Sequence, residues 1–154
     1  SDDKCAALRE ELLEEYELNL LQHGGPFDGI KEMLGSLKED NIPYGIVTNK
    51  PLRFAQSILR NEVTFRNCKT LICPDHLNAI KPDPEGILKG CKDLGIHPAE
   101  CIYVGDHKKD LEAGLNAGTQ VIACYYGYSL KNDHNEHILG ANHPSDLYQL
   151  ISQL

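Results

Sequence analysis

The chain has 154 residues, a length that fits one domain and is sufficient for a core of two or three layers. Its formal net charge of -8, without any run of Lys and Arg, argues against nucleic acid or an anionic membrane surface as a partner. The apolar runs are too short to span a bilayer and the acidic start has no signal-peptide pattern, so we expect a globular cytoplasmic protein.

The first predicted element is a helix near the start of the sequence. In CAALREELLEEYELNLLQH, the apolar residues Cys5, Leu8, Leu12 and Tyr16 recur at helical spacing with acids between them. Gly24-Gly25-Pro26 then interrupts the pattern. We therefore expect an amphipathic helix with a firm end at the glycines.

A second helix and a first strand follow. FDGIKEMLGSLKEDN repeats the helical pattern through Ile30, Met33, Leu34 and Leu37. IPYGIVTN is a short apolar segment of the kind that forms a strand buried on both faces.

Strands and helices alternate along the rest of the chain. We expect helices and strands in turn, with helices from Pro51, from Pro84 and over 107–117, and strands over 70–73, 101–105 and 119–124. A last helix is expected to open at Ser145 and to bury Leu147, Leu150, Ile151 and Leu154. This alternation with short connections predicts an α/β fold, a three-layer Rossmann-like core with a parallel sheet and helices on both faces.

Polar residues follow three of the predicted strands. In such sheets ligands bind at the carboxyl ends of the strands, so Thr48, Asp106 and the loop before Lys81 should share one crevice. Thr48 and Asn49 offer a hydroxyl and an amide to a phosphoryl oxygen. Pro82 stiffens the loop that presents Lys81. Taken singly, these residues are also explained by an ordinary strand-end turn and a surface lysine.

Two carboxylates lie around the first turn of the helix expected over 107–117. Asp106 and Asp110 are four residues apart and so point towards the same side. A pair of carboxylates suits a hard cation with oxygen ligands, above all Mg²⁺. The structural alternative is that Asp106 caps the helix, while Asp110 is an acidic residue of the kind that is common in a first helical turn.

The combination of these segments is more specific than its parts. The chain resembles the haloacid dehalogenase-like (HAD) hydrolase superfamily, in particular its phosphoglycolate phosphatase-like branch, over about Gly25 to Tyr128. The resemblance rests on YGIVTNKP (44–51), IKPDPEGIL (80–88), YVGDHKKDLEAGLNAG (103–118) and YYGY (125–128).

The resemblance implies a Mg²⁺-dependent phosphatase that acts on a small phosphomonoester, such as phosphoglycolate or a sugar phosphate, through an aspartyl-phosphate. It implies these roles: Thr48 holds the phosphoryl group, Lys81 neutralises nucleophile and phosphate, Asp106 binds Mg²⁺, Asp110 supports the metal site and Asn49 adds a phosphate contact. The charges involved make the cations necessary, because each pair of negative charges 4 Å apart costs about 4 kcal/mol in a semi-polar site.

One family motif is not found in the sequence. It is a buried strand ending in Asp-x-Asp-Gly-Thr, which supplies the nucleophile, and neither Asp28 nor Asp75 is a credible substitute. In the family this strand lies between the strands that carry Thr48 and Asp106, so we expect a slot in the sheet. We expect a fragment, a truncated product, or a chain that self-associates or takes a strand from a neighbour, and we expect it to be inactive alone.

The resemblance also suggests a division of the chain. Residues 1–23 would be a remnant of the family's helical cap domain or a linker, and residues 24–154 would be the core. Two departures are expected: GANHPSDL passes almost directly into a helix where the family has a short extra strand, and His107 stands where relatives often carry Ser or Thr.

Two other functions remain open. A non-catalytic module would keep phosphate and Mg²⁺ binding, or a regulatory role, without chemistry. A response-regulator receiver also places Asp, Thr and Lys at strand ends, but in a different order, since Thr48 and Lys81 here precede the acids.

The six cysteines form no Cys-x-x-Cys pair, and several fall in apolar runs, so we expect buried free thiols. A zinc cluster is disfavoured by the irregular spacing of its candidates, Cys68, Cys73, His76, His134 and His137.

Overall fold

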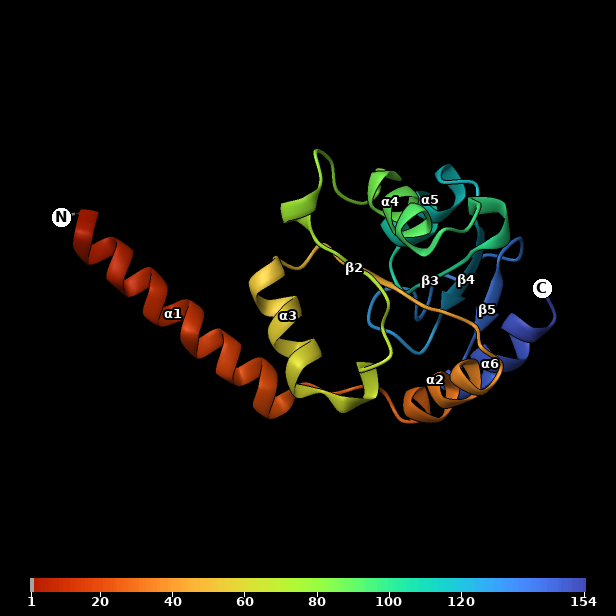
Figure 1. Ribbon diagram of the computed structural model, residues 1–154, viewed down its shortest axis with the longest axis horizontal. Coiled ribbons are helices and arrows are strands. Elements are labelled where there is room, and N and C mark those ends of the chain that lie inside the picture. The colour runs from red at the N-terminus through yellow and green to blue at the C-terminus, as the bar shows by residue number, and fades with distance from the viewer. Residues whose placement is uncertain (1) are drawn as a thin grey trace.

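The computed structural model describes residues 2–154, in which helices and short strands alternate (Figure 1). The helices are α1 (Asp2–His23), α2 (Ile30–Glu39), α3 (Leu52–Asn61), α4 (Glu85–Leu94), α5 (Lys108–Asn116) and α6 (Pro144–Ser152). The strands are β1 (Ile46–Val47), β2 (Leu71–Ile72), β3 (Ile102–Gly105), β4 (Gln120–Cys124) and β5 (Leu139–Ala141). Short 3₁₀ turns lie at Val63–Phe65, Pro74–His76 and Pro98–Glu100.

The strands form two separate parallel sheets. β1 pairs with β2, placing Ile46 opposite Leu71. β4 lies between β3 and β5, and all three run parallel. Within residues 2–154, no strand joins β1 to β3. The expected parallel α/β architecture is confirmed, with an interruption between the strand before Thr48 and the strand before Asp106.

Helices cover both faces of the strands, as a three-layer core requires (Figure 1). On one face α4 and α5 meet, and Cys91 packs with Ala113 against Tyr103 of β3. On the other face α2 and α6 pack together over β4, with Leu147 buried against Ile122. β4 is the most deeply buried strand, since its last four residues are all buried.

The first helix is confirmed, but it projects away from the core and contacts α3 (Figure 1). Its apolar positions are not covered, since Leu8 and Leu12 are 65% and 66% exposed. Polar and aromatic contacts attach it instead: Arg53 of α3 pairs with Glu10 and with Glu17, and the Tyr16 ring packs edge-to-face against Phe54.

The C-terminal region corrects two expectations. A short strand, β5, does precede the last helix, and the expectation that it would be absent is wrong. It extends the sheet at the edge of β4, and the Tyr125 amide beyond β4 donates to the Ala141 carbonyl. The helix itself begins at Pro144, a residue suited to a first helical position, and Leu154 lies beyond its end and is 49% exposed rather than buried.

The cysteines are free thiols, as expected, and Cys73, Cys91 and Cys124 are buried, but Cys5 is exposed on α1. The disfavoured zinc cluster does not form among the described residues. None of the helices within residues 2–154 combines the length and the apolar character needed to cross a membrane.

Candidate phosphate and metal site

Lys81 joins the two sheets at the carboxyl ends of their strands. Its Nζ donates to the Val47 carbonyl of β1 at 3.1 Å and to the Tyr103 hydroxyl of β3 at 3.0 Å. The same ammonium lies 2.7 Å from Oδ1 of Asp110. The end of β1, the loop before α4 and the start of α5 therefore meet at one point.

The Lys81–Asp110 ion pair is nearly enclosed, since the two side chains are 9% and 7% exposed. Burial alone would lower the pKa of Lys81, but Tyr103 and the hydrogen bonds to Asp110 and Tyr103 outweigh it and raise this pKa above its ordinary value. Burial raises the pKa of Tyr103, and Lys81 opposes the rise. The site thus holds a permanent cation beside a neutral phenol at physiological pH.

Asp110 also organises the start of α5. Its Oδ2 accepts hydrogen bonds from the amides of Asp106 at 3.2 Å and His107 at 3.0 Å. The turn is tight, because a Cβ on Gly105 would lie 2.4 Å from the Asp110 Cβ. Asp110 therefore orients the first turn of α5 and also pairs with Lys81.

Asp106 is the more accessible carboxylate of the two. Its Oδ2 accepts from the Tyr128 amide at 3.0 Å, and its Oδ1 lies 2.9 Å from Nδ1 of His107. The side chain is 29% exposed. Asp106, His107 and Asp110 each offer one ligand atom, and these atoms lie within 4.8 Å of one another. Two carboxylates and an imidazole at this spacing fit a divalent cation.

Thr48 and Asn49 lie at the end of β1, next to the Val47 carbonyl that Lys81 contacts. Oγ1 of Thr48 accepts from the Lys50 amide at 3.1 Å, which leaves its hydroxyl hydrogen for an outside acceptor. Nδ2 of Asn49 donates to the Lys81 carbonyl at 3.2 Å, so Asn49 ties β1 to the lysine loop. The structure thus brings all five sequence-predicted site residues to one edge.

Two contributors were not found from the sequence. In the sequence, Tyr103 is part of an apolar strand. Its hydroxyl belongs to the site only because Lys81 donates a hydrogen bond to it in the folded chain. Tyr128 contributes its backbone amide, and the type of a residue does not predict such a contact. The adjacent Gly127 does indicate that the chain passes close to another group. A Cβ on Gly127 would lie 2.5 Å from Oδ2 of Asp106. Asp75, rejected as a nucleophile, accepts from the Leu52 amide at the start of α3.

Comparison with known proteins agrees with this arrangement. The sequence profile of the family "Haloacid dehalogenase-like hydrolase" matches residues 1–124. An N-acetylmuramic acid 6-phosphate phosphatase from Pseudomonas putida is 40% identical over 153 residues, which are 97% of this chain and 68% of that protein. A phosphoglycolate phosphatase from Xanthomonas campestris is 38% identical over 127 residues, which are 82% of this chain and 58% of that protein.

Solved structures show the same fold. One described as a predicted phosphoglycolate phosphatase from Haemophilus somnus has a TM-score of 0.83 at 24% identity, covering 97% of this chain and 68% of that one. A HAD-superfamily hydrolase from Ehrlichia chaffeensis has a TM-score of 0.71 at 27% identity, covering 83% and 58%. The chain spans between 58% and 68% of the length of these four relatives.

Proposed function

The chain belongs to the haloacid dehalogenase-like hydrolase family, and on that basis we propose that it forms the phosphate- and metal-binding part of a Mg²⁺-dependent phosphatase. The observation that carries this proposal is the contact of Lys81 with β1, β3 and Asp110 at once. This contact gathers a hydroxyl, an ammonium and two carboxylates from three separate segments, as transfer of a dianionic phosphoryl group requires.

The substrate we propose is a small phosphomonoester, and a sugar phosphate is favoured over phosphoglycolate. The relative named for N-acetylmuramic acid 6-phosphate matches over 153 residues, whereas the phosphoglycolate phosphatase of similar identity matches over 127. The longer match covers 97% of the chain. We therefore use N-acetylmuramic acid 6-phosphate as the first substrate to test.

The proposed roles follow from the positions of the side chains. The Thr48 hydroxyl and the Lys81 ammonium would hold the phosphoryl oxygens, while Asp106 and Asp110 would hold Mg²⁺. Bound there, Mg²⁺ would offset negative charge on the phosphoryl group. His107 contacts Asp106 and would fix the orientation of that carboxylate.

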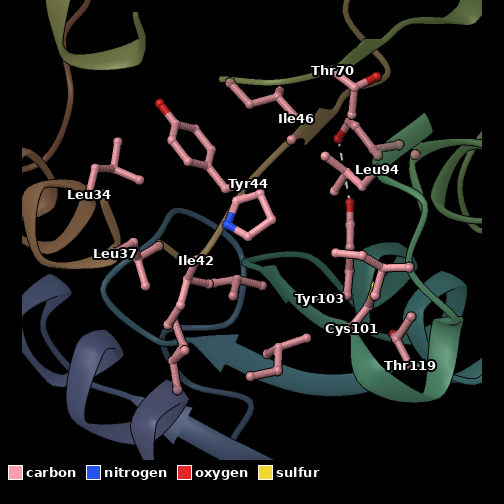
Figure 2. Close-up of a pocket in the computed structure, with 18 of the residues that line it drawn as sticks. Leu34, Leu37, Ile42, Tyr44, Ile46, Thr70, Leu94, Cys101, Tyr103 and Thr119 are labelled. Carbon is pink, nitrogen blue, oxygen red and sulfur yellow. Dashed lines mark hydrogen bonds between the residues drawn. The ribbon is translucent and has the colours of Figure 1, made fainter. Parts of the chain in front are cut away.

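The nucleophile is proposed to come from a strand that fills a cavity between the two sheets. The cavity has a volume of about 600 Å³. Leu37, Tyr44 and Ile46 line it on one side, and Cys101 and Tyr103 on the other (Figure 2). The Tyr44 hydroxyl is buried there without a hydrogen-bond partner among the described residues. An apolar strand that carries the missing motif, from a different chain or a longer polypeptide, would pair with β1 and β3 and bring a carboxylate to Lys81.

A complementation assay tests this proposal. Phosphate release from N-acetylmuramic acid 6-phosphate is measured with the purified chain, with and without a synthetic peptide that has an apolar strand followed by Asp-x-Asp-Gly-Thr. We expect negligible turnover alone and Mg²⁺-dependent turnover with the peptide. Asp106→Ala should abolish it, whereas Asp133→Ala, at an exposed ion pair with Lys108, should not. Hydrolysis by the chain alone that Asp106→Ala abolishes would refute the external nucleophile.

The second candidate is a non-catalytic binding module. Within residues 2–154, the cluster that could hold a metal ion has two carboxylates, Asp106 and Asp110, and both are already assigned to the metal rather than to a nucleophile. Calorimetry establishes whether phosphate and Mg²⁺ bind, and the turnover assay with the strand peptide separates the two functions. A binding module takes up phosphate and Mg²⁺ yet shows no turnover with any added strand peptide. A phosphatase gains turnover with the peptide.

A further inference from the structure

Three aromatic side chains gather beside Asp106, and we call Phe27, Tyr126 and Tyr128 the aromatic cluster. The ring centroids of Phe27 and Tyr126 lie 5.3 Å apart in an edge-to-face arrangement, and those of Phe27 and Tyr128 lie 5.7 Å apart. Phe27 comes from the link between α1 and α2, whereas the two tyrosines follow β4. The cluster therefore unites two segments that are distant in sequence.

The loop that carries the tyrosines has a fixed position relative to Asp106. The Tyr128 amide donates to Oδ2 of Asp106 at 3.0 Å. No side chain fits between loop and carboxylate, because a Cβ on Gly127 would lie 2.3 Å from the Asp106 Cβ. The backbone of Tyr128 is thus held directly against Asp106, one of the proposed metal ligands.

The outer rings of the cluster are open to solvent. Tyr128 is 85% exposed and Phe27 is 41% exposed, whereas the preceding Tyr125 is 8% exposed and belongs to the core. Phe27 also contacts the partly buried Tyr126, which connects the α1–α2 link to the core. Tyr128 adds little to that packing, so its exposed ring is available to a ligand.

We propose that the Tyr128 ring, supported by Phe27, stacks against the sugar ring of a sugar phosphate whose phosphoryl group is held by Thr48 and Lys81. This inference rests on the proposed function. The face of an aromatic ring is electron-rich, and a pyranose presents a face of C–H groups that packs against it. Phosphoglycolate has two carbons and no ring, so the stacking would select sugar phosphates over it.

Calorimetric titrations with Mg²⁺ present test the inference on the whole chain. Three ligands are compared: N-acetylmuramic acid 6-phosphate, phosphoglycolate and inorganic phosphate. We expect Tyr128→Ala to weaken the sugar phosphate about five- to tenfold and to leave the other two unchanged, and Tyr128→Phe to restore binding. Tyr148→Ala is the control, since the Tyr148 hydroxyl bonds to Asp40, which precedes β1 at the opposite end of the strands.

The other outcomes overturn the inference in distinguishable ways. Equal weakening of all three ligands by Tyr128→Ala would show that Tyr128 acts through Asp106 alone. No weakening of the sugar phosphate would show that the ring makes no contact with it. Failure of the unaltered chain to bind any of the three ligands would overturn the proposed function, and the inference with it.

Discussion

At the scale of single residues, Lys81 and Asp110 form a buried ion pair whose members depend on each other. Removing one partner of such a pair leaves an uncompensated charge in a site that excludes water. We predict that Lys81→Met lowers the free energy of unfolding by about 3–5 kcal/mol, as measured by urea denaturation. It should also abolish phosphate binding.

The chain offers matched controls for this prediction. Lys108 and Asp133 form an exposed pair, with side chains 79% and 51% exposed, so Lys108→Met should change stability little. The double substitution Lys81→Met with Asp110→Asn should recover part of the lost free energy of unfolding, because it also removes the buried charge of Asp110. Equal effects of Lys81→Met and Lys108→Met would contradict a special role for the buried pair.

A second prediction at this scale concerns alkaline pH. Burial raises the pKa of the Cys124 thiol from 9.0 to about 11, and burial raises that of Tyr44 from 10.0 to about 12. As pH rises above 9, the unfolded chain loses these protons before the folded chain does, so the free energy of unfolding should fall. Urea midpoints at pH 8, 9.5 and 10.5 measure the fall. Cys124→Ala should make the fall smaller between pH 9 and 11, and a midpoint that does not change with pH would refute the argument.

The site residues that the sequence predicts are those whose chemistry is visible in their type and spacing. Thr48, Lys81 and Asp106 each follow an apolar strand, and a parallel sheet brings such ends together. Tyr103 and Tyr128 escape this reasoning. One acts through a hydroxyl that meets Lys81 only after packing, and the other through its backbone amide.

At the scale of elements, close contact between α5 and the sheet depends on a glycine. A Cβ on Gly114 would lie 2.8 Å from Cγ2 of Val121 and 3.2 Å from the Tyr103 Cβ. Alanine normally favours a helix, but here overpacking should outweigh that preference. We predict that Gly114→Ala lowers the free energy of unfolding by about 1–3 kcal/mol.

Gly35 in α2 provides the matched comparison. A Cβ there would meet nothing within 4 Å, so Gly35→Ala should raise the free energy of unfolding by about 0.5–1 kcal/mol. Thermal denaturation of both variants measures the two effects together. Stabilisation by both substitutions would show that α5 can move away from the sheet without cost.

The order of elements was predictable because each has a strong period or a clear stop signal. The exceptions are short or depend on partners. β5 has three residues, too few for a pattern, and forms because β4 offers an edge. The exposure of Leu8 and Leu12 on α1 could not be predicted from their spacing either. Helical spacing of apolar residues predicts an apolar face of the helix, but it does not predict which segment covers that face.

At the scale of the whole molecule, the two sheets differ in the support they receive. β1 and β2 contribute two paired residues each, whereas β4 is paired on both sides and fully buried over its last four residues. Local opening should therefore be easier around β1 and β2. We predict that their amides exchange with deuterium faster than those of β4, as measured by mass spectrometry.

The same exchange measurement tests whether a strand fills the cavity between β1 and β3. Pairing there would give hydrogen-bond partners to both facing edges, so the strand peptide should slow exchange at β1 and β3 and leave α1 unchanged, because α1 contacts α3 away from the cavity. A peptide of the same length, with Pro substituted at alternate positions, is the control, since it cannot donate the ladder hydrogen bonds. Uniform slowing in every element would indicate general stabilisation. Slowing confined to α1 would place the peptide elsewhere and refute pairing in the cavity.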